Sequence, residues 1–250
     1  MAAARASVLE GVSISTFVQY VLDKHSTTSV LIVCGTKETF AEQLQADVRL
    51  DAAKRAEEAA TDYEAVQMLG SAPRRLESRP TLRLLSTLRN VRMVFCPDVM
   101  HLRAYLTMIA VKIEHTSAEP QTTGTPSRIL AILDLVQLHR STSAFSAQGL
   151  NRTFSAAVEA AFSTNSRLVV ADCFAAPDKV QGAEPPPEAE APPLQSDVPT
   201  DAWDEELSIL NVTTKSFGVG ERDWVGRTVK LRTVAQRWCV FEKLAVPSPR

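Results

Sequence analysis

A short turn after an apolar run brings together residue types that bind phosphate in other proteins. The segment CGTKET (34–39) contains a glycine, a lysine and two hydroxyl side chains. A phosphate-binding loop requires G-x-x-x-x-G-K-[ST], because its glycines let backbone N–H groups surround the phosphates while the lysine and hydroxyl reach phosphate and magnesium. This turn has one glycine and too few residues, and Glu38 adds negative charge. We therefore expect Gly35, Thr36 and Lys37 to form a degenerate nucleotide site without a bound cofactor.

An acidic residue near the end of a second apolar run extends the same question. Asp134 lies in ILAILDLV (129–136), the most strand-like run of the sequence. In a nucleotide-binding protein an acid at the end of such a strand would hold magnesium. Without a phosphate-binding loop this role is lost, and we predict that Asp134 caps or pairs locally.

Six cations in the second half of the chain form a candidate nucleic-acid surface: Arg140, Arg152, Arg227, Lys230, Arg232 and Arg237. Trp224 and Trp238 lie close to the last four in sequence. Basic and aromatic side chains together can follow a nucleic-acid backbone and stack on its bases. In GRTVKLRT (226–233), however, cations alternate with apolar residues, which is also typical of the solvent face of a half-buried strand. Both interpretations stay open at this point.

A small α/β enzyme with an unrecognised site is a further alternative. Its catalytic groups would gather at the carboxyl ends of the strands. The residues expected there are Gly35, Thr36, Pro97, Asp98, His139 and Arg140. Asp98 and His139 could form an acid–base pair, although helix capping and a solvent-exposed loop position explain them without chemistry. The histidines lack the H-E-x-x-H spacing of a zinc site and the serines lack a G-x-S-x-G elbow, so we predict no metal and no catalytic nucleophile.

The periodicity of apolar residues predicts alternating strands and helices. Continuous apolar runs indicate strands covered on both faces, at 29–35, 91–97, 128–138 and 167–173. Amphipathic segments predict helices at 14–23, 36–48, 81–88, 98–113 and 146–164. Three later β-like stretches, 207–214, 226–233 and 237–244, predict an antiparallel ribbon that completes the sheet. We expect an α/β fold with a mostly parallel sheet flanked by helices and antiparallel C-terminal strands.

Composition sets the remaining limits. Of the 250 residues, 45% are hydrophobic and the formal net charge is −2, so no global positive field indicates nucleic-acid binding. The four scattered cysteines show no zinc-like spacing and suit a reducing compartment. No apolar run is long enough to span a bilayer, so we expect an intracellular protein without membrane contact. We expect one domain over 1–250, with a helical or loose insertion at 49–79 and a disordered acidic, proline-rich linker at 176–202.

The order of these elements resembles that of RecA-like ATPases and recombinases. The resemblance rests on the turn in SVLIVCGTKETF (29–40), the acid in LAILDLV (130–136), the helix GLNRTFSAAVEAA (149–161), the strand RLVVAD (167–172) and the basic end of the chain. It covers 14–244 apart from the two insertions, but the phosphate-binding loop is missing. The resemblance therefore implies a RecA-like subunit that has lost ATP chemistry.

Two known assemblies use RecA-like subunits that have lost ATP chemistry, and this sequence is similar to a subunit of each. The stretch HLRAYL (101–106) and the LDLV segment (133–136) resemble the small recombinase paralogue of the Shu complex, which partners a SWIM-domain zinc protein. This resemblance implies a nuclear role in homologous recombination and DNA repair, with single-stranded DNA as the ligand. The alternative is an Elongator-type RecA-like subunit, which would bind tRNA in wobble-uridine modification in the cytoplasm.

Overall fold

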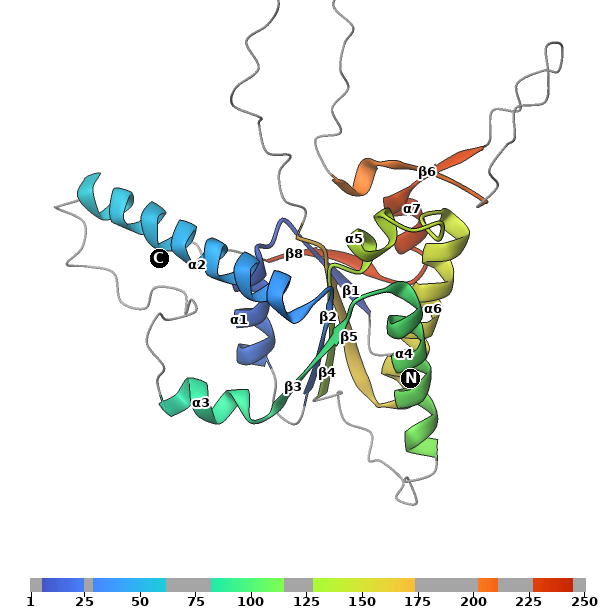
Figure 1. Ribbon diagram of the computed structural model, residues 1–250, viewed down its shortest axis with the longest axis horizontal. Coiled ribbons are helices and arrows are strands. Elements are labelled where there is room, and N and C mark those ends of the chain that lie inside the picture. The colour runs from blue at the N-terminus through green and yellow to red at the C-terminus, as the bar shows by residue number, and fades with distance from the viewer. Residues whose placement is uncertain are drawn as a thin grey trace, which may run out of the picture.

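Six apolar segments form the parallel strands of one sheet. The computed structural model describes residues 6–24, 29–61, 82–114, 128–173, 202–210 and 227–244 (Figure 1). The strands of the sheet are β1 (Ser7–Glu10), β2 (Ser29–Cys34), β3 (Val91–Cys96), β4 (Arg128–Leu133), β5 (Ser166–Ala171) and β8 (Val240–Lys243). Their spatial order is β3-β2-β4-β5-β1-β8, and every neighbouring pair is parallel. The predicted α/β class with a mostly parallel sheet is confirmed.

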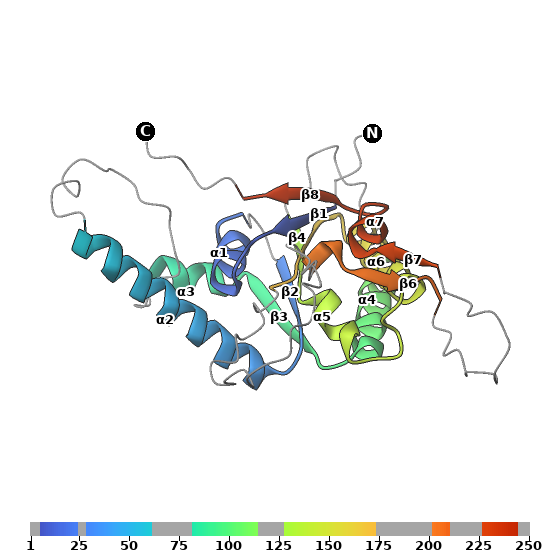
Figure 2. The same cartoon turned by 90° about the horizontal axis from the view of Figure 1, so that it is seen from above.

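Helices cover both faces of this sheet (Figures 1 and 2). On one side lie α1 (Ile14–Lys24), α2 (Lys37–Thr61) and α3 (Leu82–Leu88). On the other side lie α4 (Val99–Glu114), α5 (Leu135–Arg140), α6 (Ala147–Ser163) and α7 (Leu231–Ala235). The five predicted helices correspond to α1, α2, α3, α4 and α6, so apolar periodicity located them correctly.

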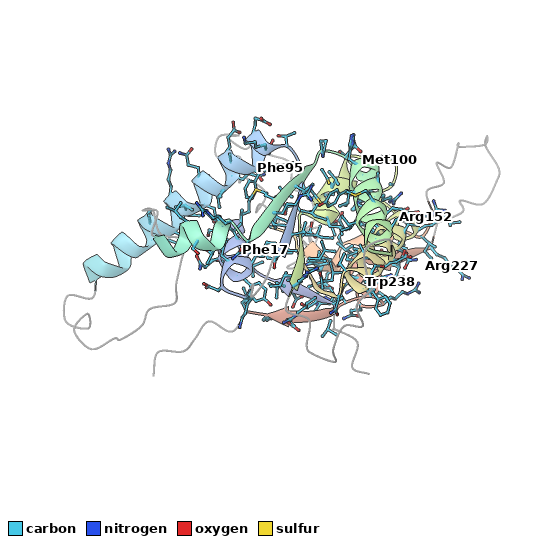
Figure 3. All side chains as sticks on the ribbon, turned by 90° about the horizontal axis from the view of Figure 1, so that it is seen from below. Phe17, Phe95, Met100, Arg152, Arg227 and Trp238 are labelled. Atoms are coloured by element: carbon cyan, nitrogen blue, oxygen red, sulfur yellow. The ribbon has the colours of Figure 1, made fainter. Side chains whose placement is uncertain are left out.

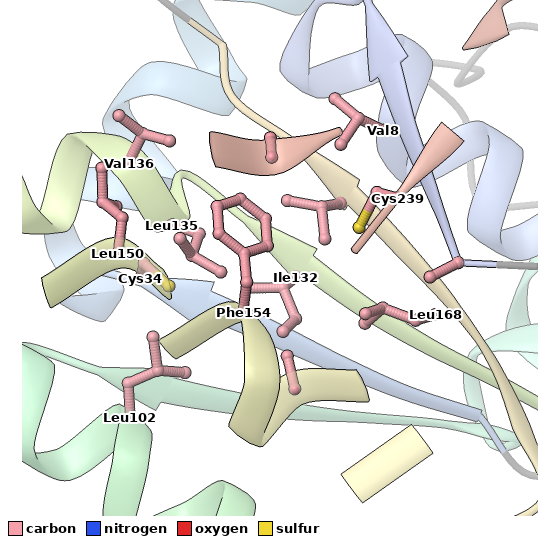
Figure 4. Close-up of a cluster of buried hydrophobic side chains, with 14 of the residues drawn as sticks. Val8, Cys34, Leu102, Ile132, Leu135, Val136, Leu150, Phe154, Leu168 and Cys239 are labelled. Atoms are coloured by element: carbon pink, nitrogen blue, oxygen red, sulfur yellow. The ribbon is translucent and has the colours of Figure 1, made fainter. Parts of the chain in front are cut away.

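Two hydrophobic cores, one on each face, hold the helices to the sheet. Phe17 and Val21 of α1 are fully buried against one face. On the other face, Leu102 of α4 and Phe154 of α6 pack over Ile132 of β4 (Figure 4). Because each central strand contributes alternate side chains to both cores, its sequence is apolar throughout rather than alternating.

The predicted strand at 128–138 is too long. β4 ends at Leu133, and Asp134 adopts a left-handed backbone conformation with φ 61° and ψ 38°. The next residues form α5, in which the N–H of Leu138 donates to the carbonyl of Asp134 over 3.0 Å. Leu135 and Val136 are buried in the core on the face of the sheet that carries α4 and α6, which explains why their apolar character resembled a continuation of the strand.

The predicted antiparallel ribbon is only partly correct. After a short 3-10 turn (Ala202–Asp204), β6 (Glu206–Ser208) and β7 (Thr228–Lys230) do pair antiparallel, but as a separate two-stranded sheet. From Leu231 onward the expected strand 226–233 is helical and forms the start of α7, because Leu231, Val234 and Ala235 share one buried helical face. The last strand, β8, pairs parallel with β1.

The two predicted insertions fall largely outside the described residues. The helix predicted at 36–48 continues as α2 to Thr61, so the first part of the 49–79 segment is helical. Residues 62–79 and 176–201 lie outside the described part of the chain. None of the helices in the described ranges is long and apolar enough to cross a membrane.

The start of α6 has no space for a larger residue at position 149. A Cβ atom on Gly149 would overlap the carbonyl oxygen of Ala144. We expect Gly149→Ala to lower the free energy of unfolding by about 1–3 kcal/mol, because either the loop before α6 or the helix must move. Urea denaturation measures this loss. Gln148→Ala, at the exposed neighbouring position, should change stability by less than about 0.5 kcal/mol; equal effects of the two substitutions would contradict the close contact.

Candidate functional site

Two strand-to-helix turns lie where a ligand would bind in a sheet of this kind. Ligands bind at the carboxyl edge of an open α/β sheet, between neighbouring strands whose following helices lie on opposite faces. β2 leads to α2 on one face and its neighbour β4 leads to α5 and α6 on the other. β1 also leads to a helix, α1, through residues 11–13, a turn that sequence reasoning missed together with β1 itself.

The turn after β2 is too short to surround a phosphate group. Only Gly35 and Thr36 separate β2 from α2. The N–H of Gly35 donates to the carbonyl of Cys96 over 2.8 Å, and Thr36 Oγ1 accepts from the N–H of Thr39 over 3.2 Å. Thr36 is therefore a helix cap, and two of the backbone and side-chain groups that could surround a phosphate are already bonded. The side chain of Lys37 is exposed.

Asp134 binds the backbone of the neighbouring strand end. Its Oδ1 accepts a hydrogen bond from the N–H of Cys173 over 2.8 Å, and its own N–H donates to the carbonyl of Ala171 over 2.8 Å. Burial raises the pKa of the Asp134 carboxyl to about 6, and the bond from Cys173 acts in the opposite direction. The side chain of Asp134 does not cap α5, and its partner Cys173 lies 39 residues away, so a contact between two strand ends replaces the expected capping or local pairing.

Asp172, directly after β5, makes the corresponding interaction with the backbone of α5. Sequence reasoning missed this residue. Its Oδ1 accepts hydrogen bonds from the N–H groups of Val136 (2.8 Å) and Gln137 (3.1 Å). Burial, followed by the nearby charge of Asp134, raises the pKa of the Asp172 carboxyl to about 8. The available signal was an acid directly after an apolar strand, as in ILAILD (129–134). We name Asp134, Asp172 and the backbone groups they bind the acid clasp.

The acid clasp ties two strand ends together through one oxygen of each carboxyl group. Within the described ranges, no group of three or more His, Cys, Asp or Glu side chains is arranged to hold a metal. Cys34 lies buried beside the clasp, where burial and the two carboxylates raise the pKa of its thiol well above the usual value. A thiol of this kind stays protonated and is a poor nucleophile.

The acid–base pair considered for an enzyme does not form. Asp98 Oδ1 accepts from the N–H of His101 (2.8 Å), and its Oδ2 lies 2.6 Å from His101 Nδ1, so Asp98 caps α4. His139 is fully buried, contrary to the expected exposed loop position. Its Nδ1 donates to the carbonyl of Leu135 (2.8 Å), and its Nε2 lies 3.0 Å from Thr153 Oγ1.

His139 belongs to a buried chain of hydrogen bonds between three helices. Arg103 of α4 donates from Nε to Thr153 Oγ1 of α6 over 2.9 Å, and the Thr153 hydroxyl lies 3.0 Å from His139 Nε2 and 3.4 Å from the carbonyl of Gly149. Burial lowers the pKa of His139 to about 4, so the imidazole is neutral. Because its Nδ1 donates to Leu135, its Nε2 accepts from the Thr153 hydroxyl. His139 therefore has a structural position and no access to a substrate.

The six candidate cations divide into two groups of three. Three of them have acidic partners in the fold: Arg140 binds Glu205 (2.5 Å), Lys230 binds Asp204 (3.4 Å) and Arg232 binds Glu10 (2.5 Å). The other three are exposed and form no ion pair with any described residue: Arg152, Arg227 and Arg237. Figure 3 shows Arg152 and Arg227 on the side of the molecule that carries α6, away from Phe17 of α1. We call these three residues the arginine surface.

Trp238 does not add a fully exposed aromatic ring to this surface. Trp238 is half-buried, and its Nε1 donates to Asn151 Oδ1 over 2.8 Å. Trp224 lies outside the described residues. Beside the arginine surface, a pocket of about 260 Å³ opens between α6, α7 and the β6–β7 pair, with Arg237 in its wall.

The fold and these sites define a parallel-sheet α/β protein in which acidic side chains at the carboxyl ends of two strands bind the protein's own backbone. The chain belongs to the SPAC22G7.03-like family, whose model matches residues 7–184. None of the curated proteins matches this sequence. The matched residues include the whole acid clasp, whereas β6, β7, α7 and β8 follow after them.

The raised pKa of Asp172 predicts a pH-dependent effect of replacing it. Between about pH 4 and about pH 8 the folded chain holds a proton on Asp172 that the unfolded chain releases, so the residue's contribution to stability falls as pH rises. We expect the stability of Asp172→Asn relative to wild type to increase over this range, because an amide needs no proton. Urea denaturation across the range measures this difference.

A matched control is Asp98→Asn, which replaces an acid whose pKa is lowered by the N–H of His101. Its stability relative to wild type should not increase with pH. A constant difference for Asp172→Asn would contradict the buried, protonated carboxyl.

Arg232 and Arg237 should respond differently to charge reversal. The Arg232 guanidinium binds Glu10 and lies 4.6 Å from the ring centre of Phe241, whereas Arg237 has no described acidic partner. We expect Arg232→Glu to lower the free energy of unfolding by about 2–4 kcal/mol, because it sets two carboxylates against each other in a half-buried site. Arg237→Glu should change it by less than about 0.5 kcal/mol. Equal thermal stability of the two variants would contradict this division.

Proposed function

We propose that this chain is a non-catalytic RecA-like subunit of a recombinase-accessory complex of the Shu type, which acts in homologous recombination and DNA repair. The acid clasp carries this proposal. An acid at the end of β4 would hold magnesium in an ATPase, but Asp134 binds the N–H of Cys173 instead. The sheet edge serves to hold the subunit together rather than to bind nucleotide.

The short turns after β1 and β2 support the same conclusion. A phosphate cradle needs several consecutive backbone N–H groups that face the ligand. The turn after β2 has two residues and the turn after β1 has three. Gly11 adopts a positive φ of 63° in the second of these, which is a requirement of a tight bend. We infer that Lys37 contacts no phosphate.

A subunit without its own chemistry acts through its partners. The proposed partners are other RecA-like subunits or a SWIM-domain protein, in the nucleus, with single-stranded DNA as the shared ligand. The arginine surface supports the last part, because these three cations have no described carboxylate to neutralise them. Arg140, Lys230 and Arg232 are left out of the proposed DNA contact, because each pairs with a carboxylate of the fold.

Purification of the tagged full-length chain from its own cells, followed by mass spectrometry, tests this proposal. We expect a recombinase paralogue or a SWIM-domain protein to co-purify, and salt-sensitive binding of the complex to single-stranded DNA. Lys37→Ala should leave both results unchanged, with or without Mg-ATP. Arg237→Glu should weaken DNA binding and leave the partners in place.

Two results would contradict it. Co-purification with two other RecA-like ring subunits and a preference for tRNA would favour the Elongator-type function. A loss of assembly in Lys37→Ala would mean that this lysine binds a ligand after all.

A further inference from the structure

The pocket beside the arginine surface combines apolar walls with a few polar groups. It has a volume of about 260 Å³ and lies between α6, α7 and the β6–β7 pair. Ile209, Leu210 and Val234 are among its apolar residues, and Gln148, Asn151 and Arg237 are among its polar ones. Apolar walls with a few fixed polar groups are typical of pockets that bind flat organic ligands.

One polar side chain in the wall, that of Asn151, is held in place by the fold. Asn151 Oδ1 accepts from Trp238 Nε1 over 2.8 Å, so the amide NH₂ of Asn151 is left to donate. The N–H of Gln148 donates to the carbonyl of Ile209 over 3.2 Å, which fixes α6 against the β6–β7 pair. An amide side chain held in this way is suited to bonding the edge of a nucleobase.

Positive charge surrounds the pocket. Arg237 lies in its wall, and Arg227 is adjacent because its carbonyl accepts from the N–H of Ile209 over 3.1 Å. Arg152 lies one helical turn after Gln148 on α6.

The acidic residues of this region are already bonded. Asp204 binds Lys230, Glu205 binds Arg140, and Glu206 accepts from Thr228 Oγ1 over 2.7 Å. These carboxylates therefore do not reach the three cations of the arginine surface, which are left to attract an anionic chain.

We propose that this pocket takes one unstacked base of single-stranded DNA while the arginine surface binds the phosphates on either side. This inference rests on the proposed function and names the site of DNA contact. Ile209, Leu210 and Val234 provide apolar walls for the faces of the base, and Asn151 provides a donor for its edge. An apolar peptide side chain would leave that donor without a partner, which favours a base over a protein segment.

Fluorescence anisotropy with the full-length chain at low salt tests the proposal. The probes are a labelled oligothymidylate and an oligomer of equal length that carries abasic sites along its backbone. We expect the abasic oligomer to bind about tenfold more weakly, because it keeps the phosphates and loses the bases. A single-stranded RNA of the same length and base sequence serves as a third probe, and we expect it to bind no more tightly than the DNA.

Two variants separate the pocket from the charge. Thr233 is exposed on α7 and lines the pocket, so Thr233→Trp should fill it and reduce oligothymidylate binding to the abasic level. Arg237→Glu should weaken binding of both oligomers. Lys54→Glu, the same charge reversal at an exposed position on α2, should change neither.

The outcomes distinguish this inference from the proposed function. Equal affinity for the two oligomers, with salt-sensitive binding, would overturn the base pocket and leave the DNA-binding role intact. Absence of binding to either oligomer would overturn the DNA contact altogether. Loss of the co-purified partners in Thr233→Trp, with DNA binding unchanged, would overturn the base pocket and assign it to a protein interface.

Discussion

The structure depends on how two buried carboxyl groups bind the backbone at the ends of adjacent parallel strands. Asp134 follows β4 and accepts from the N–H of Cys173, while Asp172 follows β5 and accepts from the N–H groups of Val136 and Gln137. Each acid thus binds the backbone that leaves the other strand. A buried carboxyl group without such bonds would destabilise the fold. Each of these bonds also fixes the direction in which the chain leaves its strand. The left-handed conformation at Asp134 and the immediate start of α5 follow from this arrangement.

The same arrangement determines what the sheet edge can do. A parallel sheet offers its carboxyl edge to ligands, and nucleotide-binding proteins use that edge for glycine-rich loops and acidic metal ligands. Here the turns are short and the acids face inward, so the chemical groups needed for phosphate and magnesium are used for folding. The three cations of the arginine surface lie elsewhere, on the side that carries α6, α7 and the β6–β7 pair. Function is therefore expected on an outer face, through contact with other macromolecules.

Much of the fold could be predicted from the sequence, and the failures have physical causes. The runs at 29–35 and 167–173 became strands because both faces of each are covered, which continuous apolar character reveals. The run at 91–97 became the edge strand β3, in which Arg92 and Met93 are exposed. β1 was missed because it has only four residues. The segment after Asp134 was misread because Leu135 and Val136 are as apolar in a buried helix as in a strand. α7 was missed because five residues of a helix resemble an alternating strand.

The candidate site was harder to predict than the fold. The role of Asp134 followed from the absent phosphate loop, but its partner Cys173 is distant in sequence and no local pattern indicates it. The pairing of Arg232 with Glu10 joins opposite ends of the chain, so sequence alone could not separate the structural cations from the exposed ones. Likewise, Asp98 and His139 were expected at one edge of the sheet, but burial directs His139 into contact with Thr153.

Hydrogen–deuterium exchange of the backbone amides that bind Asp134 and Asp172 tests the central claim most directly. Slow exchange at Val136, Gln137 and Cys173 in the free full-length chain, unchanged when Mg-ATP is added, is the result that this account predicts. Fast exchange at these amides, or a change in protection there or in the turns at 11–13 and 35–36 upon addition of Mg-ATP, would contradict it, because the sheet edge would then be open to nucleotide.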